Sequence, residues 1–419
     1  MRFDTIIIGG GLAGLICGIR LAGHNQRCAI VSSGRSSMYS FSGSFDLLGN
    51  VSNEESLYSL SDSLLQLVNE NKKHPYSKIG LSRFETLIGE FHTILNRLGI
   101  PTKGNARENH FRLTPMGTLR PAWLSADCVA ASPLADQLPW KKVAVCNLQG
   151  FMDFPHQLLA KQLLSSGVDA TIHSLDLRFL DAIGQNSTEM RSVSIARLLE
   201  KQENLEELAN ALNRIAKGHD ALLLPAVLYS AEGKAFEKLR NMVLDTELFM
   251  LPTMPPSVIG LEIESALIAE FKRLGGAFFG GDSVLKGEIQ SDKVHHINTA
   301  NHGDIAMLAD NYVLATGSFF NKGLVATHNS VYEPVFGCDV AYLPNREDWY
   351  TNNLFERQEY LGFGVETTTD FKTLSGGKPV ENLYAIGAVL SDYNPVEEGS
   401  GAGVALLTAL CVANHILKL

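Results

Sequence analysis

The sequence is poor in cysteine, and its cysteines are not spaced for a metal or a cluster. Iron–sulfur clusters and structural zinc sites are held by closely spaced cysteines, often in C-x-x-C pairs. No such pair occurs, so we expect no metal site on this chain and interpret the cysteines as buried thiols in a reducing cytoplasm. The six are scattered over 419 residues: Cys17, Cys28, Cys128, Cys146, Cys338 and Cys411.

Long apolar runs and an excess of positive charge are also missing. A helix that crosses a bilayer needs about 18 or more consecutive apolar residues, and the chain has no such run. We therefore expect no membrane span, which leaves peripheral attachment through a partner open. The formal net charge is -10, which argues against a global attraction to nucleic acid. We expect no nucleic-acid partner.

A glycine-rich turn follows the first apolar run. The segment DTIIIGGGLAG is typical of a strand buried on both faces that ends in a turn, and LAGLICGIRLAGH continues with helical spacing. Gly9, Gly11 and Gly14 form a G-x-G-x-x-G pattern in this strand–turn–helix context. The pattern predicts that a dinucleotide phosphate binds at the start of the helix. The alternative is a glycine-rich turn without a ligand.

The acid that usually grips a ribose after the second strand is absent. That strand is RCAIVSS, and Ser32 stands where an aspartate or glutamate is expected. A serine hydroxyl can accept a hydrogen bond from the ribose, but this bond lacks the charge that a carboxylate would add. The binding of adenosine is therefore expected to be weaker. Arg35 follows and could contact a phosphate, as in an NADP or mononucleotide site, or could be a solvated surface residue.

Two later strands also end in turns that are typical of flavoproteins. VLATGSFF ends a buried strand at Thr316 and Gly317, and ENLYAIGAVLSD ends another at Gly387. Small residues, among them Gly399 and Gly401, then open the last helix, GAGVALLTALCVANHILKL. A flavin ring edge could lie against this helix start, where the helix dipole favours negative charge on the reduced ring. Close helix packing through glycines is the alternative.

Two further segments belong to this interpretation. In FSGSFDLL, Ser42 and Gly43 are small enough for their backbone to contact an isoalloxazine ring, although an ordinary turn would have the same composition. Ala388 stands where related flavoproteins often carry an acid, and Asp392 is a candidate substitute.

The pattern of elements predicts an α/β fold: an FAD/NAD(P)-binding Rossmann-like flavoprotein domain with an inserted second α/β domain. The first domain is expected from both chain ends, residues 1–100 and 263–419, and the insertion from 101–262. Residues 54–98 have mostly helical spacing, and 101–140 are expected to be irregular. A helix beginning near Asn186, its candidate cap, is expected in the insertion.

These motifs resemble the B subunit of anaerobic glycerol-3-phosphate dehydrogenase, and the similarity runs over nearly the whole chain. The resemblance rests on these segments: MRFDTIIIGGGLAGLICGIRLA, SFSGSFDLL, RLTPMGTLRPAWL, FMDF, LPTMPPSVIG, LATGSFFNKGLVA and NLYAIGAVL.

The resemblance implies a bacterial enzyme that oxidises sn-glycerol 3-phosphate to dihydroxyacetone phosphate and passes electrons to the quinone pool. It implies FMN on this subunit, with FAD as the alternative; FMN has no adenosine, which fits the serine at position 32. It also implies an FAD-bearing A subunit and an iron–sulfur C subunit that anchors the complex to the membrane. This chain would then be peripheral, at the cytoplasmic face of the inner membrane.

The sequence does not identify the catalytic residues. Oxidation of a secondary alcohol needs a proton acceptor, and His110, His156 and His302 are candidates outside any motif. Arg112 and Arg120 flank LTPMGTL and could bind the substrate phosphate. Three roles stay open: an electron-transferring subunit whose partner does the substrate chemistry, a self-sufficient FAD-dependent oxidoreductase, and a non-catalytic scaffold with a degenerate cofactor fold.

Overall fold

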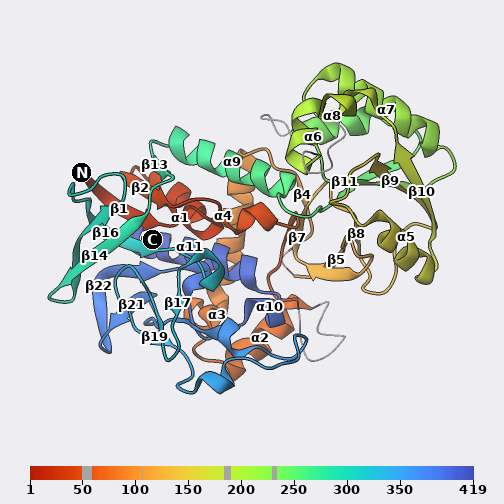
Figure 1. The fold of residues 1–419 in the computed structure, drawn as a ribbon. Coiled ribbons are helices and arrows are strands. Elements are labelled where there is room, and N and C mark those ends of the chain that lie inside the picture. The colour runs from red at the N-terminus through yellow and green to blue at the C-terminus, as the bar shows by residue number, and fades with distance from the viewer. Residues whose placement is uncertain (50–58, 106, 184–189, 229–233) are drawn as a thin grey trace. The chain divides into compact units, whose positions relative to one another are not determined.

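The protein divides into two compact units, each described here by itself (Figure 1). The computed structural model describes residues 1–49, 59–105, 107–183, 190–228 and 234–419. The first unit comprises residues 1–37, 46–98 and 264–419, and the second comprises 38–45 and 99–263. The short segment 38–45 groups with the second unit because its strand β3 (Ser44–Phe45) pairs with β7 (Leu124–Ala126).

A six-stranded sheet forms the centre of the first unit, in the order β13-β2-β1-β16-β22-β21. All neighbours pair in parallel except β21, which is antiparallel to β22. The strands are β13 (Ala277–Gly280), β2 (Cys28–Ser32), β1 (Arg2–Ile8), β16 (Leu308–Leu314), β22 (Lys378–Ala385) and β21 (Lys372–Ser375). The chain leaves β1 for β2 on one side and returns to β16 on the other, so a ligand crevice is expected where these strands end.

Two helices of unusual apolarity cover this sheet. Ten of the eleven residues of α1 (Leu12–Ala22) are buried, and α11 (Gly401–Leu417) is buried from Gly403 to Ala413 except at Ala405. The two helices pack against each other, which explains why both are apolar nearly all round. Arg20 of α1 donates to Asn414 Oδ1 of α11 at 2.8 Å and so ties the two helices together.

The remaining elements of the first unit are short or peripheral. The helices are α2 (Leu60–Glu70), α3 (Pro75–Ile79), α4 (Phe84–Arg97) and α10 (Pro395–Glu398). The strands pair as hairpins or ribbons: β14 (Val284–Gln290) with β15 (Lys293–Thr299), β17 (Val325–Ala326) with β18 (Val331–Tyr332), and β19 (Val340–Ala341) with β20 (Gly364–Val365).

The second unit contains a parallel four-stranded sheet and two small antiparallel sheets. The parallel sheet has the order β10-β9-β11-β12, from β9 (Lys142–Leu148), β10 (Asp169–Leu175), β11 (Ala221–Pro225) and β12 (Glu247–Leu251). Its helices are α5 (His156–Ser165), α6 (Ser192–Leu199), α7 (Gln202–Ala216), α8 (Ala235–Met242) and α9 (Val258–Arg273), whose last ten residues belong to the first unit. The small sheets are β3-β7-β4, with β4 (Thr102–Lys103), and β6-β5-β8, from β5 (His110–Leu113), β6 (Leu119–Ala122) and β8 (Ala131–Ser132).

Several expectations from the sequence can be compared with these elements. The helical character expected over 54–98 is confirmed from Leu60 onward, and the start of that range lies outside the described residues. The expectation that 101–140 is irregular is wrong, because this segment holds five short strands. Strands of two to four residues are too short to give an alternating pattern, which explains the error. Asn186 lies outside the described residues, and the helix of that region begins at Ser192.

The glycines of the first turn are required by close backbone approach. Gly9 has φ +120°, and a Cβ there would lie 2.1 Å from the carbonyl oxygen of Ala315, just after β16. A Cβ on Gly14 would lie 2.0 Å from the carbonyl oxygen of Gly9. Both positions therefore exclude any side chain, because a backbone atom cannot give way as a flexible side chain can.

We expect Gly9→Ala to lower the free energy of unfolding by several kcal/mol, since it adds a backbone clash to an unfavourable φ. The measurement is urea unfolding of the purified chain. The control is Gly89→Ala in α4, where a Cβ meets nothing within 4 Å and alanine is the better helix former by about 1 kcal/mol. Equal stability of the two variants would contradict the prediction.

Candidate functional site

The start of α1 offers open backbone at the edge of the sheet. Gly11 is the N-cap residue of α1, and no side chain of the described residues caps the helix there. No acidic residue occupies the first turn. A Cβ on Gly11 would come no closer than 3.6 Å to its nearest neighbour, Ser36. Unlike Gly9 and Gly14, Gly11 therefore makes no backbone contact that excludes a side chain. The helix N–H groups and the helix dipole at this position favour a phosphate.

The end of β16 adds a buried hydroxyl in need of a partner. Ala315 packs against Gly9, and Thr316 and Gly317 follow directly. Thr316 Oγ1 is buried and has no hydrogen-bond partner among the described residues. Buried hydroxyl groups almost always have a partner. A ligand group bound at the end of β16 would supply the missing hydrogen bond. Thr316 is therefore a candidate ligand-binding residue.

The turn after β22 contacts both covering helices. Gly387 has φ +71°, and a Cβ there would lie 2.9 Å from Ala13 Cβ of α1 and 3.7 Å from Ala405 Cα of α11. Its N–H donates to Thr408 Oγ1 at 3.0 Å. The structure thus places Gly387 between the first turn of α1 and the second turn of α11.

The end of β2 is closed by contacts within the protein. Ser32 is 7% exposed, and its hydroxyl donates to the Gly34 carbonyl at 3.2 Å. The Ser32 carbonyl accepts a hydrogen bond from the N–H of Asp282 at 3.1 Å. Arg35 lies on the surface beyond this turn. Residue 32 at the end of β2 is a serine and not an acid, as the sequence indicated, and it makes local hydrogen bonds there.

A buried network holds the start of α11. Glu398 Oε2 accepts hydrogen bonds from Ser400 Oγ at 2.7 Å and from His74 Nε2 at 3.1 Å. The N–H of Tyr76 donates to His74 Nδ1 at 2.9 Å, so the ring proton of His74 is on Nε2. Glu398 Oε1 accepts from the N–H of Asn394 at 3.0 Å. This network fixes the position of the loop that leads into α11.

The glycines of that loop serve close packing. A Cβ on Gly399 would lie 3.1 Å from Gly49 Cα, and one on Gly401 would lie 3.3 Å from Pro395 Cβ. A Cβ on Gly403, one turn into the helix, would lie 2.2 Å from the Tyr76 hydroxyl. Sequence reasoning selected Gly399 and Gly401 but missed His74, Tyr76 and Glu398. These residues are far apart in the sequence and belong to no motif, so no local signal pointed to them.

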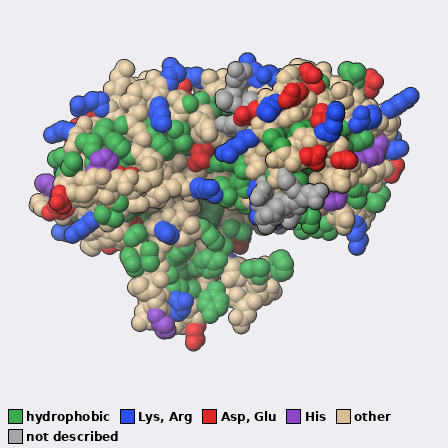
Figure 2. All heavy atoms as spheres, turned by 45° about the horizontal axis from the view of Figure 1, so that its top comes forward, with side chains coloured by type: hydrophobic (Ala, Val, Ile, Leu, Met, Phe, Trp, Pro, Cys, Tyr) green, Lys and Arg blue, Asp and Glu red, His purple; other side chains and the backbone are tan. Residues whose placement is uncertain are grey.

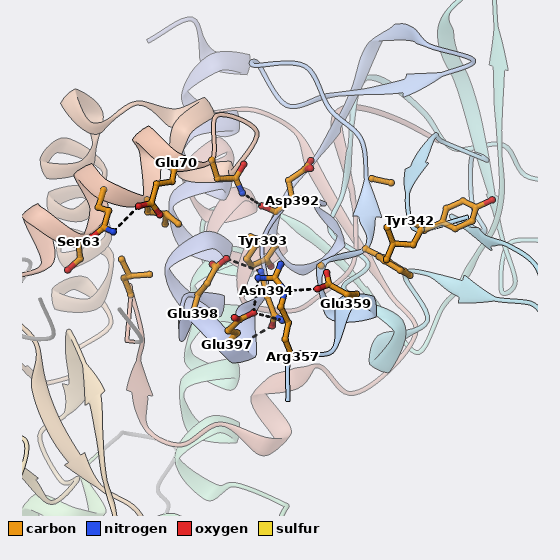
Figure 3. Close-up of a pocket in the computed structure, with 18 residues that line it drawn as sticks. Ser63, Glu70, Tyr342, Arg357, Glu359, Asp392, Tyr393, Asn394, Glu397 and Glu398 are labelled. Atoms are coloured by element: carbon orange, nitrogen blue, oxygen red, sulfur yellow. Dashed lines mark hydrogen bonds and ion pairs between the residues drawn. The ribbon is translucent and has the colours of Figure 1, made fainter. Parts of the chain in front are cut away.

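Asp392, the candidate substitute for the acid missing at position 388, lines a pocket beside this loop (Figure 3). Asp392 has φ +68°, and its carboxylate accepts from Ser391 Oγ at 2.5 Å. Ala388 is exposed. The pocket lies wholly in the first unit and has a volume of about 760 Å³.

The second unit holds the two remaining predicted cofactor residues. Gly43 is buried with φ +84°, and a Cβ there would lie 2.7 Å from Val129 Cγ2. Ser42 beside it is half-buried. The next residue, Ser44, makes a buried hydrogen bond to Ser125 Oγ at 2.7 Å. Gly43 is therefore accounted for by packing within the second unit.

The strand register of the second unit brings three candidate substrate residues together. Arg112 and Arg120 are direct partners in the antiparallel pair of β5 and β6. Opposite residues share a face of the sheet, and His110, two residues before Arg112, shares that face as well. Two guanidinium groups on one face of a sheet offer donors that suit the oxygens of an anion.

His110 is neutral over most of the pH range. Burial, followed by the positive charges of Lys103 and Arg112, lowers the pKa of His110 to about 4. Its Nε2 lies 2.7 Å from Ser125 Oγ, and its Nδ1 is buried without a partner among the described residues. The other two candidate histidines have structural partners. His156 Nδ1 lies 3.0 Å from Asn147 Nδ2, and His302 Nδ1 lies 2.9 Å from Asp282 Oδ2.

Comparisons with known proteins match this chain over nearly its whole length. The model of the FAD binding domain family matches residues 4–404. The B subunit of anaerobic glycerol-3-phosphate dehydrogenase from Yersinia enterocolitica is 44% identical, over 100% of this chain and 99% of that protein. The corresponding protein of Pectobacterium atrosepticum is 40% identical over equal shares.

The chain belongs to the family of anaerobic glycerol-3-phosphate dehydrogenase B subunits. The resemblance stated from the sequence is thereby confirmed, as are the flavoprotein fold class and the assignment to the oxidoreductases. The family model supports a flavin cofactor, and FAD more directly than FMN. A solved 3-ketosteroid Δ1-dehydrogenase from Sterolibacterium denitrificans is 9% identical, with a TM-score of 0.46, and covers 100% of this chain and 99% of its own.

Over the described residues, no helix combines the length and the apolarity that a membrane crossing requires. Within the same residues, no three histidine, cysteine, aspartate or glutamate side chains are grouped as metal ligands.

We expect the stability of the protein to fall as the pH is lowered from about 6.5 to 4, in part because of His110. In that range the unfolded histidine takes up a proton and the folded one does not, so acid favours unfolding. The contribution is at most about 3 kcal/mol. Urea unfolding at several pH values should show a shallower dependence for His110→Gln than for the wild type. The control, His328→Gln at an exposed position, should leave the slope unchanged; an unchanged slope in His110→Gln would contradict the prediction.

Proposed function

We propose that this chain is the flavin-carrying subunit of a quinone-linked anaerobic glycerol-3-phosphate dehydrogenase, which oxidises sn-glycerol 3-phosphate to dihydroxyacetone phosphate. The observation that carries the proposal is the convergence of three motifs in one unit: the α1 turn, Thr316 at the end of β16, and the Gly387 turn against α11. The full-length relatives with this name support it.

The flavin phosphate is proposed to lie at the start of α1, beside Gly11. Thr316 Oγ1 would donate to or accept from the cofactor, because this buried hydroxyl needs a partner. The start of α11 would face the flavin ring, where the helix dipole stabilises negative charge. Bound flavin supplies the acceptor for the hydride that leaves C2 of the substrate. Gly11 and Thr316 would hold the cofactor, and the hydrogen bonds of Glu398 to His74 and Ser400 would keep the loop before α11 in place.

FMN is the proposed flavin because β2 ends in Ser32, at the position where an acid usually binds the adenosine ribose. Ser32 uses its hydroxyl as a donor to Gly34 and its carbonyl as an acceptor from Asp282. FMN needs no ribose grip at that position, whereas FAD would have to be held without charge assistance. The family model describes an FAD-binding domain, so the two flavins must be distinguished by experiment.

Acid release of the cofactor from the purified chain, followed by chromatography, should yield one flavin per chain, with FMN as the main species. The intact protein should be yellow in the same proportion. A dominant FAD peak would show that the cofactor is FAD and not FMN. The proposed position of the flavin site would be unaffected. Protein free of flavin after expression in flavin-replete cells would contradict the cofactor role and support the scaffold alternative.

Arg112 and Arg120 are proposed to bind the phosphate of the substrate. The two arginines are direct partners on β5 and β6, and guanidinium groups suit the geometry of a phosphate. His110, on the same face, could accept a proton because it is neutral near pH 7. We assign no catalytic base beyond this position.

We expect Arg120→Ala to raise the KM for glycerol 3-phosphate by about 10-fold or more, since a charge-assisted hydrogen bond contributes about 1.5–3 kcal/mol. The stability of the protein should change little, because Arg120 is exposed. The assay is steady-state turnover of the intact complex with an artificial electron acceptor. Arg178→Ala, at a side chain 93% exposed in the same unit, is the control. An unchanged KM would place the phosphate elsewhere, including on a partner chain.

The proposed partners are an FAD-bearing A subunit and an iron–sulfur C subunit. The relatives are named as one subunit of a dehydrogenase, which supports an assembly of several chains. The C subunit is proposed to anchor the complex, with this chain peripheral at the cytoplasmic face of the inner membrane and electrons leaving to quinone.

A further inference from the structure

A surface loop of the first unit presents two large apolar side chains to solvent. Apolar side chains are exposed over much of the surface, interspersed with charged ones (Figure 2), and single exposures of this kind need no explanation. Leu354 and Phe355 differ because they are adjacent in sequence and are 81% and 97% exposed. Clustered exposure of large apolar side chains is typical of interaction sites.

The loop that carries these residues, Thr351–Gln358, is held in one shape by a buried amide. Gln358 is 8% exposed, and its Nε2 donates to Thr351 Oγ1 at 2.9 Å, to the Asn353 carbonyl at 3.0 Å and to the Glu356 carbonyl at 3.2 Å. Its Oε1 accepts from the N–H of Thr351 at 3.1 Å. The loop therefore displays its apolar tip in a fixed conformation, which lowers the entropy cost of binding a partner.

The end of the same loop forms one wall of the pocket described above (Figure 3). Among the described residues that line the pocket, Arg357 has the only basic side chain. That guanidinium is occupied, with Glu359 at 2.8 Å and Glu397 at 3.5 Å. The acidic residues of the lining are Glu70, Glu359, Asp392, Glu397 and Glu398. The carboxylates outnumber the one cation, so the pocket favours a positive charge from outside.

A further exposed apolar side chain lies on α10, next to residues that line the pocket. Val396 of α10 is 69% exposed and precedes two residues that line the pocket. The pocket wall itself includes apolar groups, among them Leu343 and Phe363. An acidic recess with apolar borders suits a protein surface of opposite charge more than a small cation, which would leave Leu354 and Phe355 in water.

We propose that loop Thr351–Gln358 and the acidic pocket form one docking surface for another subunit of the complex. That subunit presents an apolar recess for Leu354 and Phe355 and a lysine or arginine side chain for the pocket. The proposal rests on the proposed function, which requires an assembly of several chains. A second copy of this chain is a poor occupant, because an isologous contact would place this acidic surface against itself.

The test uses the tagged chain co-expressed with the A and C subunits of its complex. We expect the double variant Leu354→Asp/Phe355→Asp to recover at least 10-fold less of one partner subunit than the wild type. Its melting temperature and flavin content as an isolated chain should be unchanged, since both side chains lie outside the fold's core. Leu285→Asp, at a 61% exposed position on β14, is the matched control and should retain both partners.

A charge variant tests the pocket separately. Glu397→Lys should weaken recovery of the same partner as the double variant, and raised salt should weaken the wild-type complex in the same direction. Full recovery of both partners with Leu354→Asp/Phe355→Asp would overturn the proposal. So would a wild-type dimer of the isolated chain, detected by light scattering, that this variant dissociates. A wild-type chain that recovers neither subunit would instead contradict the proposed function.

Discussion

The close approach of three backbone segments at the end of β1 is the constraint on which the first unit depends. The N–H of Gly9 donates to the Val31 carbonyl on β2, and the N–H of Ala315 donates to the Ile8 carbonyl, both at 2.8 Å. Because Gly9 carries no side chain, the end of β16 can lie against the turn while α1 starts directly behind it. The same approach leaves Gly11 open at the helix start. The pairing of β1 with β16 and the accessible start of α1 are thus two results of one backbone geometry.

The parts of the site that follow from local sequence were predictable, and the parts that depend on register or long-range packing were not. The turn with Gly9, Gly11 and Gly14 was predicted because each glycine acts within one strand–turn–helix unit. Arg112 and Arg120 were selected singly, but their direct opposition depends on a two-strand register that strands of four residues do not reveal. The structure was also needed to show that Gly9 and Gly14 are required by close backbone packing, whereas Gly11 is not.

The network behind α11 shows most clearly where sequence reasoning ends. Glu398 accepts hydrogen bonds from Ser400 and from His74, and His74 lies 324 residues away from it in the chain. Each member is an ordinary polar residue in its own segment. Only the fold makes them a buried cluster, in which the tautomer of His74 is fixed by the backbone of Tyr76. A cluster of this kind rigidifies the loop before α11 because every member depends on the others for its partners.

The position of β1 between β2 and β16 has a consequence for synthesis of the protein. β1 and β2 can pair as soon as the first βαβ segment leaves the ribosome, but the other edge of β1 waits for Leu308–Leu314. At about 5–20 residues per second, that delay is on the order of 15–60 s. Throughout it, an apolar strand has unpaired N–H and C=O groups along one edge, which is the form most prone to pairing with another chain. The insertion of a second unit into the first therefore lengthens the period in which a nascent chain depends on chaperones.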